Sequence, residues 1–595
     1  MTAYLPPLRD MDFVLRDLAG LDRVAALPGF EDATPELVGS VLEEAGRIAE
    51  EVLAPLNQPG DRQGARLVDG KVRTADGWQA ALDTLIDGNW LGLPYAEQWG
   101  GMGLPGLVNV AVSEMWQAAN MAFALCPMLT QGAVNAIEEC GSPEQKAKFL
   151  PKLVTGQWAG TMNLTESGAG SDLGAIRTKA VRNGDHYLIS GQKIFITYGD
   201  HELVENIIHL VLARTPDAPP GVKGISLFIV PKILVNDDGS LGARNDVTCV
   251  SLEHKMGIHA SPTAVMSFGD KGGAVGTLVG EENRGLEYMF VMMNHARLNV
   301  GVQGLAIAER AYQQARAYAR ERVQGKAIGC AEKGGIVDHP DVRRMLMTMK
   351  SQVEAMRALA YVAGAALDVA HRHPDAAVRA QAKVEAEFLN PIVKGWCTEV
   401  GNEVASLGVQ VHGGMGYIEE TGACQHLRDA RITTIYEGTT AIQANDLVNR
   451  KILRDQGAAA RAELAKAQAL AAELTAQGDD MLAAIGQSLH AAAAAAGQAV
   501  DWLLSAAVED ARLPAAAAVP LLRLLGTVLG GVQMARAAAL ARRRLDAKEG
   551  DPEFLQAKLS TAWFYAESVL PQAEGLLGSI TRGTRTVMAL HPDLL

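Results

Sequence analysis

The chain has few cysteines, and none of them is spaced as a metal ligand. The six cysteines form no CxxC pair, and the thirteen histidines include no HExxH motif. Scattered single cysteines predict free thiols and exclude a recognisable disulfide framework or zinc site. The cysteines are Cys126, Cys140, Cys249, Cys330, Cys397 and Cys424.

The chain also lacks an excess of basic residues over acidic ones. The 595 residues include 54 lysines and arginines against 68 aspartates and glutamates, a formal net charge of −14. Proteins that bind nucleic acid normally present a basic face, so we expect no nucleic-acid partner. Hydrophobic residues make up 48% and charged residues 21% of the chain, which is typical of a globular protein. The length predicts three or four domains.

No long uninterrupted apolar run is present. The first residues, MTAYLPPLRDMDFVLRDL, carry early charges and lack the apolar core of a signal peptide. The most apolar stretch, residues 513–535, is interrupted by Pro520 and Arg523, and its uncharged part ends at Ala535. That part is too short to span a bilayer. We expect a cytoplasmic protein without a transmembrane segment, in which this stretch is a buried helix; association with a membrane surface is the alternative.

Periodicity divides the chain into four predicted domains. Residues 1–160 are mainly helical in pattern, with a helix that ends at Pro55 and another capped by Ser142. Short alternating or apolar runs predict a central β-domain over 161–280. Helical periodicity returns over 281–452, and an alanine-rich segment predicts an additional helical bundle over 453–595. The literal GxGxxG at 101–106 follows no predicted strand, so it does not indicate a dinucleotide site.

Several glycine-rich or polar segments are candidates for ligand contact, although each also fits an ordinary structural role. MNLTESGAGSD (162–172) is a loop of hydroxyls and glycines that can form an anion-binding nest, or simply a turn. KIFIT (193–197) is a plain strand by itself. RERVQGKAIG follows a long helix as an exposed basic terminus, and QVHGGMGY (410–417) predicts a helix that ends at Gly413 and Gly414.

Glu437 is an isolated carboxylate in RITTIYEGTTAIQ (431–443). No lysine or arginine lies between Arg431 and Arg450. The structural interpretation is an acid near the start of a helix that is capped by Thr439 or Thr440. The functional interpretation is a general base, whose pKa an apolar environment raises above its usual value of about 4.3. The glycine that follows would allow a substrate to approach the backbone.

Taken together, these segments resemble the acyl-CoA dehydrogenase family. TESGAGSD, GQKIFITYG, KMGIHASPT, HARLNVGVQGLA, RVQGK, QVHGGMGYIEE and RDARITTIYEGTTAIQ occur in the family's order over roughly residues 85–450. The resemblance implies a mainly α fold with a helical domain, a central barrel-like β-domain and a helical bundle. The alanine-rich tail is similar to a longer bacterial branch, which includes 3-methylmercaptopropionyl-CoA and long-chain acyl-CoA dehydrogenases.

The resemblance implies α,β-dehydrogenation of an acyl-CoA thioester with FAD as cofactor. Glu437 falls where the family has its base, which takes a proton from Cα while a hydride leaves Cβ for the flavin. Tyr436 and Gly438 would help to exclude water and raise the basicity of Glu437. A cation beside the base would lower its basicity, so none is expected there.

Family positions also imply the residues that contact FAD and CoA. FAD would be bound by Met162, Leu164, Thr165, Ser171, Phe195, Ile196, Thr197, Arg322, Gln324, Gln410, Gly414, Gly438 and Thr439. The substrate would be bound by Ser171, Asn294, Arg297, Tyr436 and Glu437. Arg322, Gln324, Gln410 and Gly414 would reach the FAD of a neighbouring subunit. Two segments depart from the family pattern: RVQG is shortened and lacks a phenylalanine, and His339 is followed by Pro340.

The implied partners are an acyl-CoA substrate, an electron-transfer flavoprotein as acceptor, and a second copy of the chain in a homodimer. An acyl-CoA oxidase, with the same base and flavin but oxygen as acceptor, is the nearest alternative enzyme. A helical binding protein that keeps the fold without activity is the alternative from another class. The acyl chain, either 3-methylmercaptopropionyl or a medium to long chain, is left open by the sequence.

Overall fold

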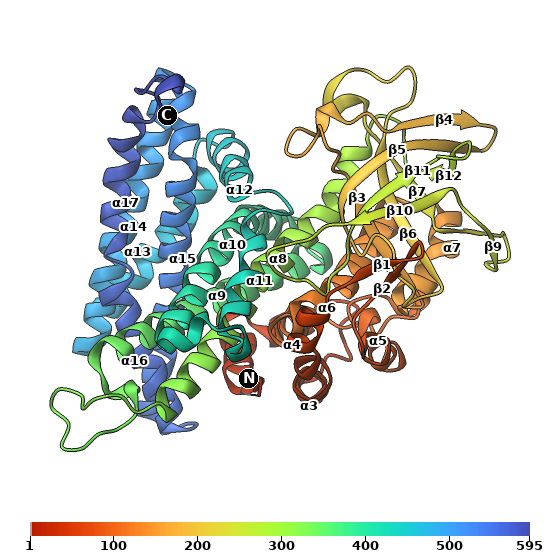
Figure 1. The fold of residues 1–595 in the computed structure, drawn as a ribbon. Helices are drawn as coiled ribbons and strands as arrows, with labels where there is room; N and C mark the ends of the chain where they lie inside the picture. Colours follow the sequence, from red (N-terminus) through yellow and green to blue (C-terminus); the bar gives the residue numbers. More distant parts are fainter. Residues whose placement is uncertain (1–2) are drawn as a thin grey trace. The chain divides into compact units, whose positions relative to one another are not determined.

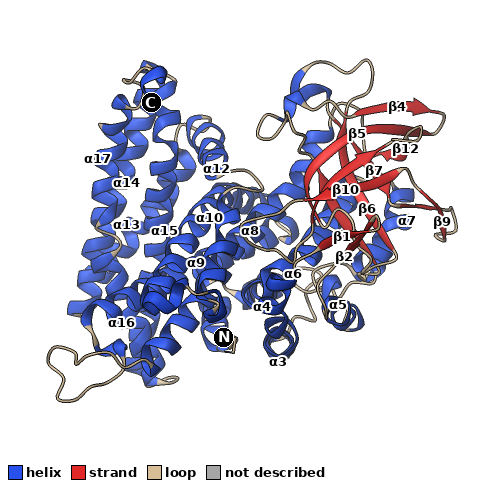
Figure 2. Ribbon diagram, in the orientation of Figure 1, coloured by secondary structure: helices blue, strands red, loops and turns tan. Residues whose placement is uncertain are grey.

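The computed structural model describes residues 3–595, which divide into two compact units. The sheet unit comprises Arg47–Asn109 and Met115–Asn299. The helical unit comprises the described residues up to Gly46, Val110–Glu114 and Val300–Leu595. Figure 1 labels the elements and Figure 2 shows the mainly helical composition. The finer division into four domains at 160, 280 and 452 stays a prediction.

The sheet unit carries the strands that its alternating sequence predicts. Its elements, in chain order, are α4 (Ala54–Gln63), β1 (Arg66–Val68), β2 (Lys71–Arg73), α5 (Trp78–Asp87), α6 (Gly106–Cys140), α7 (Pro143–Val154), β3 (Trp158–Asn163), β4 (Lys179–Asn183), β5 (His186–Thr197), β6 (Asn206–Ala213), β7 (Ser226–Pro231), β8 (Ile233–Val235), β9 (Leu241–Arg244), β10 (Val247–Leu252), β11 (Thr263–Phe268) and β12 (Ala274–Leu278). The two short strands β1 and β2 interrupt a region that the sequence predicts to be mainly helical.

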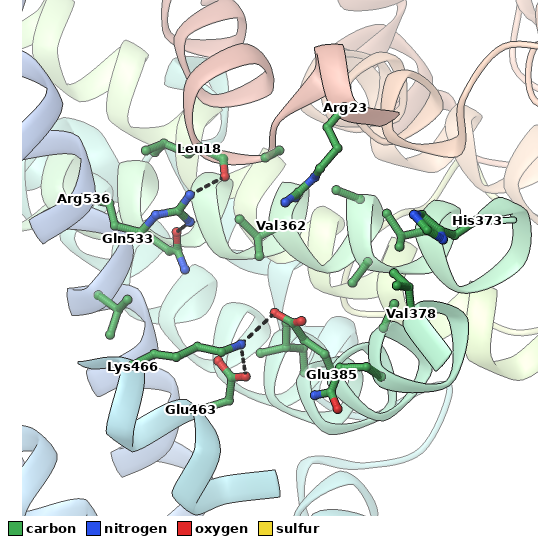
Figure 3. A pocket seen from close by; sticks show the side chains of 18 of the residues that line it. Leu18, Arg23, Val362, His373, Val378, Glu385, Glu463, Lys466, Gln533 and Arg536 are labelled. Atoms are coloured by element: carbon green, nitrogen blue, oxygen red, sulfur yellow. Dashed lines mark hydrogen bonds and ion pairs between the residues drawn. The ribbon is translucent and has the colours of Figure 1, made fainter. Parts of the chain in front are cut away.

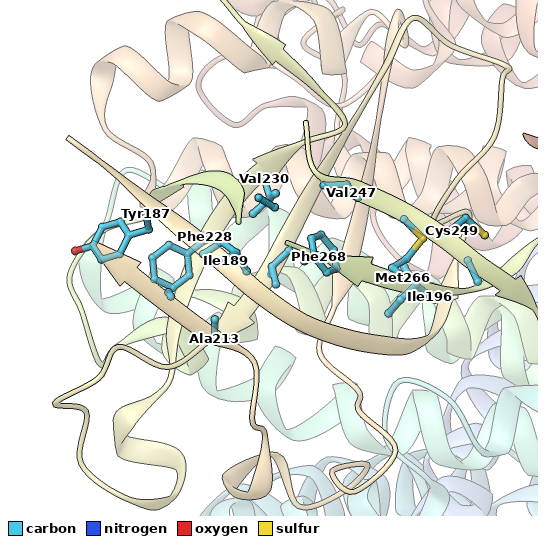
Figure 4. Close-up of a cluster of buried hydrophobic side chains, with 14 of the residues drawn as sticks. Tyr187, Ile189, Ile196, Ala213, Phe228, Val230, Val247, Cys249, Met266 and Phe268 are labelled. Atoms are coloured by element: carbon cyan, nitrogen blue, oxygen red, sulfur yellow. The ribbon is translucent and has the colours of Figure 1, made fainter. Parts of the chain in front are cut away.

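Eight of these strands form one curved sheet in the order β10-β11-β5-β12-β7-β6-β3, with β4 also paired to β5. The β3–β6 pair is parallel and the other pairs are antiparallel. Every residue of β6 and β7 is buried, so both faces of these strands are covered. Figure 4 shows the apolar core of the sheet, in which Phe228 and Phe268 pack among aliphatic side chains.

The helical unit is built from long helices, as the returning 3.6-residue periodicity predicts. Its helices are α1 (Leu8–Phe13), α2 (Leu21–Ala25), α3 (Pro35–Ile48), α8 (Gly285–Glu321), α9 (Pro340–Arg372), α10 (Ala376–His412), α11 (Ala423–Ala430), α12 (Thr440–Asp446), α13 (Ala458–Ala476), α14 (Asp480–Glu509), α15 (Arg512–Ala547), α16 (Pro552–Ser568) and α17 (Gln572–Thr581). The first residues of α8 and the last of α3 belong to the sheet unit.

Helix ends follow the predicted capping chemistry at three places. Ser142 and Gln145 form a reciprocal capping box at the start of α7. Gly413, with φ +59°, follows the last residue of α10, and Thr439 accepts the amide hydrogen of Ile442 at the start of α12.

The predicted helix end at Pro55 is wrong. A π-helical turn, Ala49–Leu53, follows α3, and the chain continues directly into α4 with Pro55 as its second residue. A proline at the start of a helix needs no amide hydrogen, and the π-turn has already interrupted the regular hydrogen-bond ladder before it. The helical path therefore passes the proline.

The alanine-rich tail forms a bundle that packs on the rest of the helical unit. Helices α13, α14, α15 and α17 run alongside one another in Figure 1, and α15 also packs against α9, α10 and α12. Helices α14 and α15 are long and apolar enough to span a bilayer, but 44% and 72% of their most apolar windows are buried inside the protein. The apolar stretch around Pro520 is thus a buried helix, as predicted.

A groove of about 1280 Å³ lies in the helical unit among α2, α9, α10, α13 and α15. Its walls are mainly apolar, and charged side chains bridge it (Figure 3). Arg536 donates to the carbonyl of Leu18 at 2.7 Å, and Lys466 pairs with Glu463 and Glu385. The groove holds none of the predicted site residues.

Candidate active site

Glu437 lies in a short loop with an unusual backbone. The loop joins a 3₁₀ turn, Arg431–Thr434, to α12, and the side chain of Glu437 is half-buried. Glu437 has φ +55° and Gly438 has φ +86°, two successive left-handed residues. A residue with a β-carbon adopts this conformation at a cost of about 1–3 kcal/mol, and such strain concentrates at functional sites.

Buried side chains from three helices hold this loop. The Tyr436 hydroxyl hydrogen-bonds to the Gln303 side-chain oxygen on α8, and Gln443 on α12 donates to the carbonyl of Glu437 at 3.1 Å. Lys394 on α10 donates to the carbonyl of Gly438 at 2.6 Å. Burial raises the pKa of Tyr436 well above its usual value, and the Glu437 carboxylate adds to that shift, so the hydroxyl keeps its proton and can donate.

The fold brings a cation, Lys394, to the loop that carries Glu437, while the expectation that no cation pairs with the Glu437 carboxylate stays a prediction. No cation is a near neighbour of Glu437 in sequence, but the fold brings a fully buried ammonium to the next residue's carbonyl. Sequence distance cannot reveal this, because Lys394 is 44 residues away from Gly438.

The segments at the ends of α8 and α10 lie together. The ring of Tyr318, near the end of α8, stacks on His412, the last residue of α10, with centroids 4.5 Å apart. This contact links the segment that carries Arg322 and Gln324 to the one that carries Gln410 and Gly414. The side chains of Arg322, Gln324 and Gln410 are exposed. The His339 ring nitrogen lies 2.8 Å from the carbonyl oxygen of Gln324, so this departure from the family pattern has a local structural role.

The flavin-loop candidates lie in the sheet unit, where β3 leads into the TESGAGSD loop. Met162 and Thr165 are half-buried, Leu164 is buried and Ser171 is exposed. Phe195 is 58% exposed and has φ +60°. It lies in a bulge, because β5 uses one residue more than β11 between the pairs Met266–Lys193 and Ala264–Ile196. The bulge presents an aromatic ring at the surface of the sheet.

Four further predicted residues, two on β5 and two on α8, differ in how far they are exposed. Ile196 is buried in the core of the sheet (Figure 4), so its side chain faces away from the side on which Phe195 is exposed. This is the ordinary alternation of a strand, in which successive side chains point to opposite faces. Thr197 is half-buried at the end of β5. On α8, Asn294 is exposed, whereas Arg297 is buried with its guanidinium 5.8 Å from the Phe290 ring.

A buried ion pair fixes the TESGAGSD loop to β5. Lys193 is fully buried and its ammonium lies 2.8 Å from the Glu166 carboxylate, while it also donates to the carbonyl of Leu164 at 2.9 Å. Burial lowers the pKa of Lys193 to about 8. Burial alone would raise the pKa of Glu166, but Lys193 and hydrogen bonds from Thr178 and Arg177 lower it below its usual value.

We expect Lys193→Met to destabilise the protein and loosen this loop. Removing one partner leaves the Glu166 carboxylate buried without its cation, which typically costs about 3–5 kcal/mol. Denaturant unfolding of the variant measures that loss, and the ratio of flavin to protein absorbance shows whether the loop still holds the cofactor. The matched control is the double variant Glu166→Gln, Lys193→Met, which removes both charges and should recover part of the stability. Equal losses in the single and double variants would contradict the pairing.

Sequence reasoning missed the residues that position the two loops: Lys193, Glu166, Lys394, Gln303 and Gln443. Lys394 interrupts an apolar run in NPIVKGWC, and Lys193 directly precedes one in GQKIFIT. A lysine within such a run is a signal of a buried cation with a specific partner, since lysine is almost never fully buried unless it is paired. Their partners, by contrast, become evident only in the fold.

The residues of the sheet unit fit a bound flavin. The exposed Phe195 ring offers an aromatic surface, and Thr165 and Ser171 offer hydroxyls. A β-carbon added to Gly168 or Gly170 would meet nothing within 4 Å, so the loop leaves room for a ligand close to its backbone. The strained backbone at Phe195 is the kind of feature that persists where function requires it.

Comparison with known sequences identifies the same family along most of the chain. Four domain families match: Acyl-CoA dehydrogenase N-terminal domain over 40–157, middle domain over 161–270, C-terminal domain over 283–453, and Acetyl-CoA dehydrogenase C-terminal like over 457–591. The chain is 51% identical to 3-methylmercaptopropionyl-CoA dehydrogenase of Ruegeria pomeroyi, over 97% of this chain and 98% of that protein. It is 34% identical to a butyryl-CoA dehydrogenase of Syntrophomonas wolfei, over 96% of both.

A solved structure shows the same fold. Acyl-CoA dehydrogenase from Bacillus anthracis, complexed with FAD, is 23% identical and superposes with a TM-score of 0.73 over 96% of this chain and 91% of that one. The family matches, the full-length relatives and the fold all indicate the same family. The chain belongs to the acyl-CoA dehydrogenase family, and is an FAD-dependent oxidoreductase of acyl-CoA thioesters.

Proposed function

We propose that Glu437 is the general base of the dehydrogenation and that 3-methylmercaptopropionyl-CoA is the preferred substrate. The observation that supports the role of Glu437 is its backbone, held left-handed by Gln443 and followed by a left-handed glycine. This conformation fixes the direction of one carboxylate in a loop that buried side chains anchor. A base must be held in reach of the proton that it removes, and a rigid loop provides that placement.

The loop also supplies what the α-proton transfer needs besides a carboxylate. The proton at Cα of a thioester is weakly acidic, so the charge that develops on the thioester oxygen must be stabilised by hydrogen-bond donors. In our proposal the amide hydrogen of Glu437 is one of these donors. Bound FAD supplies the acceptor for the hydride that leaves Cβ.

We propose that FAD is bound by the exposed face near Phe195 together with Met162, Leu164, Thr165, Ser171 and Thr197, and by the backbone of Ile196. In the helical unit, Gly438 and Thr439 follow Glu437 directly. They are the further residues that we propose to contact the reacting end of FAD. Asn294 and Arg297 are proposed for the CoA moiety, together with Ser171 and Tyr436. Arg322, Gln324, Gln410 and Gly414 are proposed for the distant end of FAD.

The substrate proposal rests on the full-length relatives. The relative that shares 51% identity is named for 3-methylmercaptopropionyl-CoA, and the one that shares 34% is named for butyryl-CoA. Both acyl groups are short, with five and four chain atoms counted from the thioester carbon. A pocket that suits one of them should lose affinity or rate as the chain lengthens beyond it.

An anaerobic titration tests the proposal directly. The purified holoenzyme is mixed with 3-methylmercaptopropionyl-CoA and with acyl-CoAs from butyryl to palmitoyl, and the loss of flavin absorbance is followed. We expect the highest ratio of reduction rate to Kd for 3-methylmercaptopropionyl-CoA, and no reduction by the free acid without CoA. Preferred reduction by palmitoyl-CoA would refute the substrate, and no reduction by any acyl-CoA would refute the activity.

The proposed electron acceptor is an electron-transfer flavoprotein. The reduced flavin must be reoxidised for turnover, and members of this family named as dehydrogenases differ from the oxidases in this step. Turnover with such a flavoprotein, and slow reaction of the reduced, product-bound enzyme with oxygen, would support a dehydrogenase. Rapid reoxidation by oxygen with release of peroxide would instead support an acyl-CoA oxidase.

A homodimer in the cytoplasm is the proposed form of the enzyme. Near the proposed distant end of FAD, Tyr417 is 84% exposed, and Met415, Ile418, Val323 and Ile328 are also exposed. In our proposal the second copy of the chain covers these exposed apolar side chains. Light scattering of the holoenzyme distinguishes a dimer from a monomer.

A further inference from the structure

The left-handed loop of Glu437 and Gly438 needs external support. Residues with a β-carbon disfavour the left-handed backbone conformation, and Glu437 has a β-carbon. From α12, Gln443 donates to the carbonyls of Glu437 and Gly438 at 3.1 and 3.4 Å. The bond from Lys394 to the Gly438 carbonyl is shorter, at 2.6 Å, and is strengthened by the charge of the donor.

Helix α8 fixes one side of the α10 turn that carries Lys394. A β-carbon added to Gly301 would lie 2.6 Å from the Val393 side chain, and one added to Gly304 would lie 2.4 Å from the Cys397 carbonyl oxygen. Real β-carbons essentially never lie this close to another atom. The two helices can therefore approach each other this closely only because glycines stand at the contact. The turn from Val393 to Cys397 therefore cannot move toward α8.

Helix α15, from the added C-terminal domain, fixes the other side of the same turn. A β-carbon on Gly395 would lie 2.7 Å from the Leu522 side chain, and one on Gly526 would lie 2.2 Å from the Trp396 ring. Trp396 is only 1% exposed, and it also packs against Gly530. The two residues that follow Lys394 are thus locked into α15.

We propose that Lys394 is a positioning residue for Glu437, and that α15 of the added domain serves the reaction by fixing the turn of α10 that carries it. This rests on the proposed role of Glu437 as the base. In this proposal the tail does more than stabilise the protein. Its helix α15 packs against Gly395 and Trp396 and so fixes the turn of α10, and Lys394 on that turn holds the loop of Glu437.

The first test is Lys394→Met in the full-length holoenzyme, followed by stopped-flow reduction of the flavin. We expect the reduction rate to fall by up to about 100-fold, the loss that a misplacement of about 1 Å can cause. The Kd for acyl-CoA should stay within a few-fold of wild type. With α-dideuterated acyl-CoA, the ratio of rates for hydrogen and deuterium should rise, because proton abstraction becomes more rate-limiting.

Lys558→Met is the control for a general loss of stability. Lys558 is also buried in the helical unit, but its partners are Asp10 and Glu354, away from the loop. This variant should be less stable yet reduce its flavin at the wild-type rate. A wild-type rate per bound flavin in Lys394→Met, whatever its stability, would overturn the proposal.

The role of α15 is tested by a pair of glycine variants in the tail. Gly526→Ala forces Trp396 to move, whereas a β-carbon on Gly497 of α14 meets nothing within 4 Å. We expect slower flavin reduction and a larger isotope effect in Gly526→Ala, and neither change in Gly497→Ala. Wild-type rates in both would overturn the part assigned to α15, and this pair remains informative if Lys394→Met does not fold.

Failure of this inference can be told apart from failure of the proposed function. If Glu437→Gln abolishes flavin reduction while Lys394→Met reduces normally, Glu437 is still the base and Lys394 does not position it. If Glu437→Gln reduces normally, the base is misassigned and Lys394 has no base to position.

Discussion

Glu437→Gln should retain the fold and FAD but lose flavin reduction by acyl-CoA. Glutamine has nearly the same shape as glutamate and keeps the side-chain volume, so the loop anchored by Gln443 and Lys394 should form as before. The amide cannot accept the α-proton. Removing a general base typically costs about 100- to 10,000-fold in rate. Stopped-flow reduction under anaerobic conditions measures the loss.

Glu403→Gln provides the matched control for this variant. Glu403 is an exposed carboxylate on α10, paired with Arg523 on α15. Its neutralisation changes the net charge as much as Glu437→Gln does, without touching the loop. We expect wild-type reduction by Glu403→Gln. A Glu437→Gln enzyme that is reduced nearly as fast as wild type would show that another group takes the proton.

Removing the tail after residue 452 should leave a chain that aggregates. Truncation would uncover Trp396 and the apolar faces of α9 and α10 that α15 and α16 cover. It would also remove Lys558, which lies in contact with Asp10 of α1 and 3.1 Å from Glu354 of α9. Size-exclusion chromatography of the truncated chain would show this as aggregation or loss of soluble protein.

A single substitution tests the same contact without truncation. Lys558→Met removes the cation that the half-buried Asp10 shares with the buried Glu354. Glu354 still pairs with Lys350, so the free energy of unfolding should fall by less than the about 3–5 kcal/mol that a fully unpaired buried charge costs. Arg461→Met, which breaks an exposed ion pair with Asp501, should change it little. A soluble, active truncated chain would mean that the tail does not stabilise the catalytic part; sedimentation of the full chain with vesicles would point to a membrane role.

Local chemistry allowed much of the fold to be predicted. The capping box at Ser142, the glycine after α10 and the Thr439 cap each depend on residues within four positions of one another, so the sequence alone specifies them. Alternation predicted strands between 161 and 280, and composition predicted the helical tail. The helix end at Pro55 was wrong because a π-turn, which has no simple sequence signal, precedes the proline.

The residue proposed as the base could be found from the sequence, whereas the residues that hold it in place could not. The sequence by itself determined that one carboxylate, Glu437, stands before a glycine in a segment without cations, and that TESGAGSD and QVHGG are segments of the kind that contact ligands. Such inferences need only residue type and spacing. They do not depend on where the rest of the chain lies.

Only the tertiary structure decided what holds these residues in place. Lys394 reaches Gly438 across 44 residues, Glu166 meets Lys193 across 27, and Gly395 meets Leu522 across a domain's length of chain. A buried ammonium is stable only where a carbonyl or carboxylate meets it, and glycines allow helices to touch only where another helix lies. These conditions are set by packing between distant segments, and periodicity within one segment carries no information about them.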